Sequence, residues 1–314
     1  MTSETSPSTA SRAAAPLSSP STARFGAYET VLYAVTVFGW STSWIAMKMQ
    51  VAGSMPETAL FWRFVVSAAM MWGWVVVARL PTRFPARMHL GFAALGVFIF
   101  SMNFDFFYHA ATGLPSGLLS VIFSLASVIN LLMGRIAFGQ RIAPRVLVGG
   151  LLGFGGVAAM FWPRIAGADF DAAALQALAL GLVGTTFFCT GNMLSSVVQR
   201  RGVPVISAAA WGMTWAIGIL AVAVLVRGGS FTVEPSAAWV GSLLWLALFS
   251  SVAAFWAYLT LLGRIGAARA GYATVMFPVF ALAISTVFEG YVWTLPAVVG
   301  LIAVMAGNLF VLRH

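Results

Sequence analysis

Ten long apolar stretches follow one another along this chain, separated by short breaks that contain Gly, Pro or Arg. About 20 helical residues are needed to cross the hydrocarbon core of a bilayer, which is roughly 30 Å thick. The expected spans are residues 29–51, 57–79, 88–112, 114–138, 143–162, 174–199, 204–227, 236–262, 266–288 and 294–312. They predict an all-α membrane protein with ten transmembrane helices, because no connection is long enough to form a soluble domain.

The composition also indicates a membrane protein. Charged residues make up 8% of the chain and the mean hydropathy is +0.94, whereas soluble domains carry about 25% charged residues. Basic residues of membrane proteins gather in cytoplasmic loops, so the net charge of +9 reports topology and we expect no nucleic-acid partner. The expected partners are the lipid bilayer and a small-molecule substrate. The sequence is compatible with a monomer and leaves the oligomeric state open.

The arginines indicate the orientation of the chain. If the N-terminus is cytoplasmic, only Arg164 and Arg227 lie in outer connections. The cytoplasmic segments then contain Arg12, Arg24, Arg79, Arg83, Arg87, Arg135, Arg141, Arg145, Arg200, Arg201, Arg264, Arg269 and Arg313. This distribution predicts that both termini are cytoplasmic, in what we expect to be a bacterial inner membrane. Residues 1–26 are rich in Ser, Thr, Ala and Pro and are predicted to form a disordered tail.

The two halves of the chain resemble each other. A shift of 150 residues superposes Tyr108 on Tyr258, Gly113 on Gly263, Phe138 on Phe288 and Gly150 on Gly300. Because each half has five spans, an odd number, the second half enters the membrane inverted. The loops agree: "GRIAFGQRIAPR" is basic, whereas its counterpart "STVFEGYVWTLP" has no positive charge. We therefore expect two inverted-topology five-helix repeats, residues 29–162 and 174–312, as in secondary transporters, whose substrate site lies near the midplane between the repeats.

Several of these segments also resemble a known family. "GWSTSWIAMK", followed by Pro56 and Arg63, is similar to the first two helices of EamA-type permeases of the drug/metabolite transporter superfamily, which have ten helices in a duplicated five-helix unit. "GYATVMFPVFALAISTVFEG" and "VVGLIAVMAG" resemble the last two helices of that unit, and "FGQRI" resembles the version in YddG-type bacterial amino-acid exporters. Two residues depart from the family pattern. Val128 stands where the second repeat has Pro278, and Gln140 stands near where many relatives have an acid. The resemblance implies export of small metabolites.

The sequence argues against an enzyme. A phosphate-binding loop of the P-loop type ends in Lys-Ser or Lys-Thr, and the only lysine, Lys48, lies in "IAMKMQ". One cysteine and three scattered histidines do not form a zinc-binding pattern. We therefore expect no catalytic residues, no metal and no cofactor.

Ionisable residues inside spans are functional candidates, because they are expensive to bury in a membrane. They are Lys48, Arg63, Asp105 and His109. At 1.5 Å per residue, Arg63 and Asp105 lie at similar depth, roughly 10 Å below the outer surface, and are predicted to form an ion pair. That pair either clamps two helices or recognises a zwitterion. Lys48 is expected to reach the outer interface, and His109 is either a hydrogen-bonded helix-end residue or a proton relay.

Helical spacing collects polar and aromatic residues on common faces. Phe104 and Phe107 are expected on other faces than Asp105. The candidate lining of a substrate cavity, aromatic with a few polar groups, consists of Trp40, Ser43, Trp44, Arg63, Ser101, Asp105, Tyr108, His109, Asn192, Tyr258 and Tyr272. The glycine-rich run "GGLLGFGGVAAM" is predicted to pack closely against another helix.

These features predict a secondary transporter that works by alternating access. The resemblance and the aromatic, weakly charged faces favour export of small neutral or aromatic amino acids or related metabolites. Two alternatives stay open: export of other metabolites or of lipophilic cations, which Asp105 and the aromatic faces would attract, and a passive channel-like facilitator.

Overall fold

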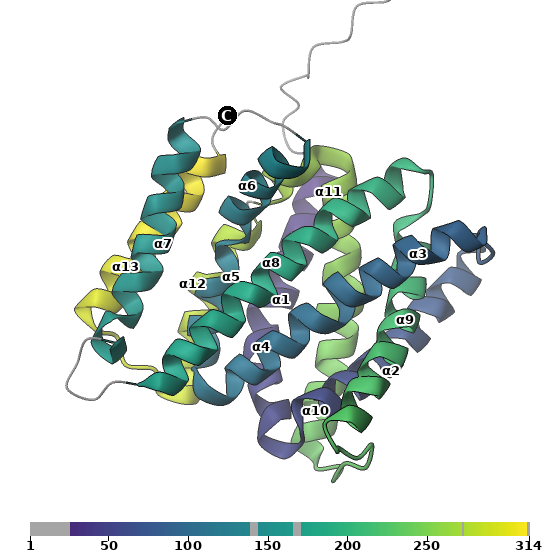
Figure 1. Ribbon diagram of the computed structural model, residues 1–314, viewed down its shortest axis with the longest axis horizontal. Helices are drawn as coiled ribbons and strands as arrows, with labels where there is room; N and C mark the ends of the chain where they lie inside the picture. Colours follow the sequence, from purple (N-terminus) through teal and green to yellow (C-terminus); the bar gives the residue numbers. More distant parts are fainter. Residues whose placement is uncertain (1–25, 139–143, 166–170, 272, 313–314) are drawn as a thin grey trace, which may run out of the picture.

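The computed structural model describes residues 26–138, 144–165, 171–271 and 273–312 (Figure 1). All regular structure in these residues is helical. Seven helical segments are long and apolar enough to cross a membrane: Ala27–Gly53, Pro56–Val77, Ala86–Gly113, Ser116–Ile136, Ala172–Arg200, Val205–Val226 and Ala237–Gly266. Three shorter apolar helices cover Leu147–Pro163, Ala273–Glu289 and Leu295–Phe310. The prediction of an all-helical protein with many apolar helices is therefore confirmed.

Helix boundaries follow the prolines of the sequence. The elements are α1 (Ala27–Gly53), α2 (Pro56–Val77), α3 (Ala86–Leu95), η1 (Gly96–Ser101), α4 (Met102–Gly113), α5 (Ser116–Ser124), α6 (Ala126–Phe138), α7 (Pro144–Ile165), α8 (Ala172–Arg200), α9 (Val205–Val226), α10 (Ala237–Trp245), η2 (Leu246–Ala254), α11 (Phe255–Ala270), α12 (Ala273–Glu289) and α13 (Leu295–Leu312). Pro56 is the first residue of α2, and Pro85, Pro115 and Pro204 directly precede α3, α5 and α9. Proline is tolerated at these places because the first helical N–H groups have no intrahelical acceptor.

Two π-helical stretches interrupt apolar helical segments. η1 joins α3 to α4, and η2 joins α10 to α11. Their first residues, Gly96 and Leu246, are separated by the same 150 residues as Tyr108 and Tyr258. A π turn holds an extra residue, and such turns occur frequently at functional sites. The sequence gives no visible signal for them.

α1 lies at the centre of the bundle. It packs against α12, η2 and α11 from the second half of the chain and against α4 and α5 from the first. α2 packs against α9, and α4 packs against α8 (Figure 1). Because α4 contacts α8, η1, α1 and α2, more than one of its faces is buried.

α7 and α13 form a separate pair at one side of the bundle (Figure 1). A Cβ atom added at Gly156 would lie 2.5 Å from the carbonyl oxygen of Gly300, and one added at Gly307 would lie 2.5 Å from that of Gly149. Only glycine allows the two backbones to approach so closely. The predicted packing role of the glycine-rich run is therefore confirmed.

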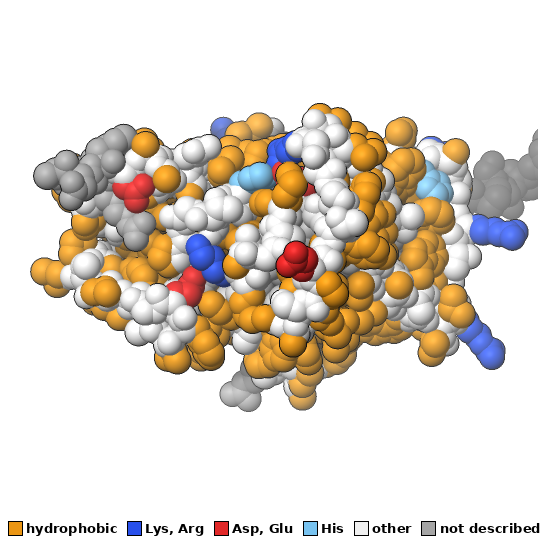
Figure 2. Space-filling model, turned by 90° about the horizontal axis from the view of Figure 1, so that it is seen from below, with side chains coloured by type: hydrophobic (Ala, Val, Ile, Leu, Met, Phe, Trp, Pro, Cys, Tyr) orange, Lys and Arg blue, Asp and Glu red, His pale blue; other side chains and the backbone are white. Residues whose placement is uncertain are grey.

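The lower end of the bundle in Figure 1 is where α1 ends, α2 begins and α9 ends. Figure 2 looks onto this end and shows acidic, basic and histidine side chains gathered near its middle, with hydrophobic side chains along much of the rim. Elsewhere Val77, Leu151 and Ile302 are among the large apolar side chains that are more than half exposed. Such a surface suits contact with lipid.

Candidate functional site

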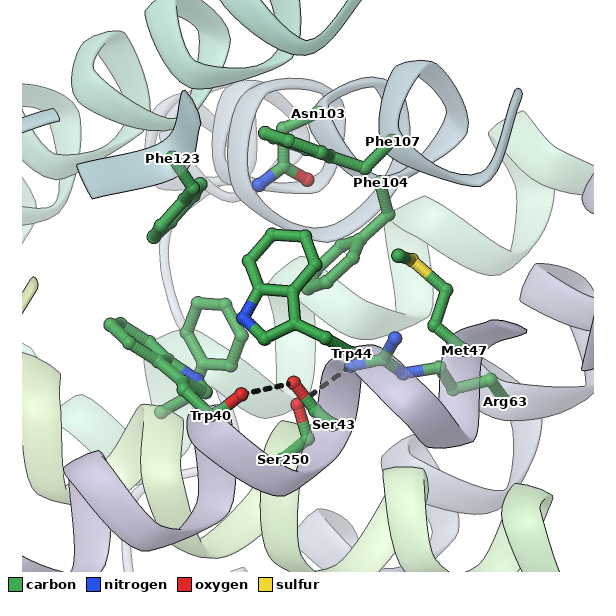
Figure 3. A pocket seen from close by; sticks show the side chains of 11 residues that line it. Trp40, Ser43, Trp44, Met47, Arg63, Asn103, Phe104, Phe107, Phe123 and Ser250 are labelled. Atoms are coloured by element: carbon green, nitrogen blue, oxygen red, sulfur yellow. Dashed lines mark hydrogen bonds between the residues drawn. The ribbon is translucent and has the colours of Figure 1, made fainter. Parts of the chain in front are cut away.

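An aromatic cavity lies inside the bundle between α1, α2, α4, α5, η2 and α11 (Figure 3). Its empty volume is about 430 Å³, including the part that is open to solvent. Six aromatic rings line it: Trp40, Trp44, Phe104, Phe107, Phe123 and Phe255. Its polar lining consists of Ser43, Arg63, Asn103 and Ser250, and Met47 completes the wall.

Trp44 is the central ring of this lining. Its centroid lies 5.2 Å from that of Phe107 and 5.7 Å from that of Phe123, both in edge-to-face arrangement. Figure 3 shows the indole between Phe123 on one side and Met47 on the other. The indole nitrogen Nε1 is buried without a hydrogen-bond acceptor among the described residues. An aromatic wall of this kind binds flat or apolar groups, and the free N–H adds one donor.

Arg63 brings a positive charge into the cavity wall. The residue is 1% exposed, and its guanidinium donates to three hydroxyl oxygens: Nε to Ser251 at 2.9 Å, Nη2 to Ser250 at 3.0 Å and Nη1 to Tyr108 at 3.3 Å. Its central carbon lies 4.3 Å from the ring centroid of Phe104.

In the part of the chain that the structure describes, no carboxylate lies within 4 Å of the Arg63 guanidinium. Arginine has five N–H donors, so two of them are left after the three hydroxyl contacts. A buried cation without a counterion is unfavourable. The cavity is therefore suited to a ligand that carries a carboxylate, which guanidinium groups bind through paired hydrogen bonds.

Asn103 supplies a hydrogen-bond acceptor on the α4 side. The residue is 2% exposed, and its Oδ1 has no donor among the described residues. Figure 3 shows its amide directed toward the part of the cavity that holds the Trp44 ring. Buried polar atoms normally have a partner, and this free oxygen can accept a hydrogen bond from a donor group in the cavity. An ammonium group is such a donor.

A second polar group of residues, which we call the Glu57 cluster, lies at the lower end of the bundle. It consists of Glu57 in the first turn of α2, Asp105 and His109 one turn apart on α4, and Arg227 directly after α9. His109 Nε2 lies 2.8 Å from Glu57 Oε1 and 3.7 Å from Asp105 Oδ1. Arg227 Nη2 donates to Asp105 Oδ2 at 3.2 Å, and Nη1 contacts Glu57 Oε1 and His109 Nε2.

The predicted ion pair between Arg63 and Asp105 is wrong. Asp105 pairs with Arg227 instead, and Arg63 turns to the serines of η2 and to Tyr108. Similar depth in the membrane does not fix the direction in which two side chains point around their helices. The π turn η2 presents Ser250 and Ser251 to Arg63, and Arg227, interpreted from sequence only as a loop charge, reaches back to α4.

The structure places the remaining predicted residues as follows. Trp40, Ser43, Trp44 and Arg63 line the cavity, and Tyr108 reaches it through Arg63. Ser101 Oγ donates to the Gly96 carbonyl at 2.8 Å within the π turn. Asn192 Nδ2 donates to Tyr258 Oη at 3.1 Å, and the Tyr258 ring packs on Trp40. Asp105 and His109 belong to the Glu57 cluster and not to the lining. Tyr272 lies outside the described residues.

Lys48 Nζ donates to the carbonyl oxygens of Ala111 and Leu114 at the end of α4, where helix carbonyls lack intrahelical partners. Its reach to the outer interface stays a prediction. Phe104 and Phe107 were missed as lining residues: they lie in the cavity wall, whereas Asp105, from which they were expected to point away, does not. Asn103 was also missed, although an amide inside an apolar span is a signal that could have found it.

His109 lies beside two carboxylates in the Glu57 cluster. One ligand atom each from Glu57, Asp105 and His109 lies within 4.8 Å of the others, a spacing compatible with a metal ion. Arg227 already contacts these three side chains and supplies positive charge there.

A bundle of apolar helices long enough to cross a membrane, packed around an aromatic cavity, is typical of a multi-pass membrane protein that binds a small molecule. The chain belongs to the EamA-like transporter family, whose sequence profile matches residues 29–162 and 175–313. A probable amino-acid metabolite efflux pump of Escherichia coli (strain K12) is 25% identical over 296 residues, which cover 90% of this chain and 95% of that protein. An uncharacterized transporter of Archaeoglobus fulgidus is 25% identical over 284 residues, which cover 90% and 98% of the two chains.

A solved crystal structure of a protein has the same fold. It superposes with a TM-score of 0.67 and covers 90% of this chain and 95% of its own, at 14% sequence identity. This likeness concerns the fold alone.

Proposed function

We propose that this protein is a secondary transporter that exports small neutral or aromatic amino acids, or closely related metabolites, by alternating access across a bacterial inner membrane. The observation that carries the proposal is the buried guanidinium of Arg63, which has no carboxylate partner among the described residues and lies in the wall of an aromatic cavity. The substrate carboxylate binds Arg63, its ammonium group donates to Asn103 Oδ1, and its side chain packs among the aromatic rings.

Three features favour a zwitterion over a lipophilic cation. A cation would be repelled by Arg63 in the same wall. Asp105, which would attract a cation, lies in the Glu57 cluster and pairs with Arg227. The E. coli relative is described as a probable amino-acid metabolite efflux pump, which agrees with a substrate that carries both charges.

The expected architecture for this function is ten membrane-spanning helices in two inverted repeats, about residues 29–162 and 174–312. The two family matches divide the chain at nearly the same places. The π turns η1 and η2 occupy equivalent positions, and the contact of α1 with η2 has its counterpart in the contact of α8 with η1. The distribution of arginines supports cytoplasmic termini, and the lower end of Figure 1 then faces the outside.

Counterflow in proteoliposomes tests the proposal. Vesicles that contain the purified protein and are loaded with unlabelled phenylalanine should transiently accumulate external labelled phenylalanine, because a carrier exchanges substrate across the membrane. The flux should saturate with concentration. Unsaturable flux without counterflow would instead identify a channel.

A ligand screen tests the substrate class. Phenylalanine and leucine should raise the apparent thermal stability of the purified protein, because a ligand that binds only the folded state stabilises it. Phenethylamine, which has no carboxylate, should raise it much less. A larger effect of phenethylamine than of phenylalanine would overturn the zwitterion proposal.

A further inference from the structure

We propose that the Glu57 cluster is a proton-binding site in which His109 takes the proton. Binding of this proton opens the lower end of the cavity. The inference rests on the proposed transport function for its readout, but it concerns a different set of residues.

The first argument is that His109 Nε2 contacts both a hydrogen-bond acceptor and a hydrogen-bond donor. His109 Nε2 lies 2.8 Å from Glu57 Oε1, which only accepts hydrogen bonds when ionised, and it also contacts Arg227 Nη1, which only donates. In the neutral imidazole with an unprotonated Nε2, this atom accepts from Arg227. In the imidazolium, the N–H at Nε2 donates to Glu57 and repels the guanidinium. Proton uptake therefore moves His109 from Arg227 to Glu57.

The second argument is the balance of charge. Glu57 and Asp105 bring two negative charges, and Arg227 brings one positive charge. These carboxylates are almost fully buried, with side chains 1% and 3% exposed. Protonated His109 completes a neutral group of four. Glu57 Oε2 is also buried without a hydrogen-bond partner among the described residues, and both His109 and Arg227 contact the other oxygen, Oε1.

The charged groups in contact with His109 are Glu57 from α2, Asp105 from α4 itself and Arg227 from the end of α9, and the ion pairs of these side chains in the described residues are with one another. Of the further elements that pack against α4, α1 carries Lys48, which donates to the carbonyl oxygens at the end of α4, and α8 directly follows Asp171. His109 is 34% exposed and Arg227 is 45% exposed. A proton from the solvent at the lower end can therefore reach the imidazole, and Arg227 has room to withdraw.

The Glu57 cluster and the cavity share two helices, α2 and α4. α2 carries Glu57 and, less than two turns further on, Arg63. α4 carries Asp105 and His109 together with Asn103, which lines the cavity, and Tyr108, which bonds Arg63. When His109 takes a proton, Arg227 loses its contact with the imidazole, and its remaining partners in the cluster are Glu57 on α2 and Asp105 on α4. The end of α9 is then held less tightly to the two helices that carry the polar groups of the cavity, and the lower end opens more easily.

The test is the pH profile of phenylalanine counterflow, measured with equal pH on both sides of the membrane. Histidine is the side chain that ordinarily changes charge between about pH 5 and pH 8. Counterflow by the wild type should rise several-fold toward pH 5.5. His109→Gln should remove this dependence, whereas His89→Gln, at the other end of the same helical segment, should keep it.

The partners of His109 give different outcomes that a merely structural role would not produce. Arg227→Gln removes the guanidinium that ties the end of α9 to α2 and α4, so counterflow should be fast at both pH 5.5 and pH 7.5 and the profile should be flat. Glu57→Gln removes a negative charge and should move the midpoint to lower pH. A wild-type profile that is flat between pH 5.5 and 7.5, or an unchanged profile in His109→Gln, would overturn the proposal. Absence of counterflow at every pH would instead contradict the proposed transport function.

A second measurement does not depend on transport. Cys189 is the only cysteine of the chain, so a Cys189→Ser, Ser43→Cys protein carries one thiol, in the cavity wall. A membrane-impermeant thiol reagent added at the lower end should label it several-fold faster at pH 5.5 than at pH 7.5, after correction for thiol ionisation with a free thiol. Adding His109→Gln should abolish the difference. Equal corrected rates at the two pH values would contradict opening by a proton.

Discussion

Arg63 on α2 donates through Nη1 to the phenol oxygen of Tyr108 on α4, at 3.3 Å, and both side chains are almost completely buried. The equivalent tyrosine of the second half, Tyr258, accepts a hydrogen bond from the neutral amide of Asn192 at 3.1 Å. Two tyrosines at matching places in the two halves thus hold groups of different charge. The first half places a cation beside the cavity, and the second half does not.

Tyr108→Phe should therefore destabilise the protein more than Tyr258→Phe. Each change removes one hydroxyl acceptor, but only Tyr108→Phe leaves a buried charged donor without that partner. An unsatisfied buried group costs about 1–3 kcal/mol, and more when it is charged. Thermal unfolding of both variants in detergent measures this difference. An equal or larger drop in the melting temperature of Tyr258→Phe would contradict the prediction.

Arg63→Gln should weaken phenylalanine binding by at least about 30-fold, because losing one partner of a buried charge pair costs about 2–5 kcal/mol. Binding of phenethylamine should be unchanged or improved, since the variant removes the positive charge that opposes its ammonium group. Calorimetric titration of both ligands separates the two effects.

The matched control for that change is Arg83→Gln, which removes an exposed arginine in the connection before α3. It should leave both affinities within about twofold. If Arg63→Gln weakened the two ligands equally, Arg63 would hold the cavity in shape and would not recognise a carboxylate.

Asn103→Leu should weaken the binding of ligands that carry an amine, whereas Arg63→Gln weakens the binding of ligands that carry a carboxylate. Asn103→Leu removes the free acceptor Oδ1 while keeping a side chain of similar size, so the substrate ammonium loses its partner. The expected loss of phenylalanine affinity is about 5- to 150-fold, corresponding to about 1–3 kcal/mol for an unpaired group. Phenylpropionate, which has the carboxylate but no amine, should bind the variant at least as well as the wild type. Equal losses for both ligands would show that Asn103 does not contact the amine.

The sequence predicts the helices better than the contacts between them. Apolar stretches and prolines place the helical segments, because the bilayer demands a certain length. Regular spacing also places Trp40, Ser43, Trp44 and Arg63 correctly at the cavity. These residues lie on α1 and α2, where no π turn precedes them along the helix.

The partners of the charged residues were not predictable from the same patterns. Arg227 reaches Asp105 across 122 positions of the sequence, and Ser251 reaches Arg63 across 188. Depth along a helix can be counted from its end, but the direction of a side chain depends on helix rotation, which η1 and η2 change. The clustering of His109 with Glu57 likewise depends on how α2 and α4 pack.

Gly156→Ala should destabilise the α7–α13 pair, whereas Gly155→Ala should not. A Cβ at Gly156 would lie 2.5 Å from the Gly300 carbonyl oxygen, a backbone atom that cannot move aside easily. A Cβ at Gly155 would meet nothing within 4 Å. Overpacking of this kind costs about 1–3 kcal/mol. An alanine in an open helical position is favoured over glycine by up to about 1 kcal/mol. Thermal unfolding should therefore show a lower melting temperature for Gly156→Ala and an equal or higher one for Gly155→Ala. If both variants lowered the melting temperature equally, α7 and α13 would not approach each other through Gly156.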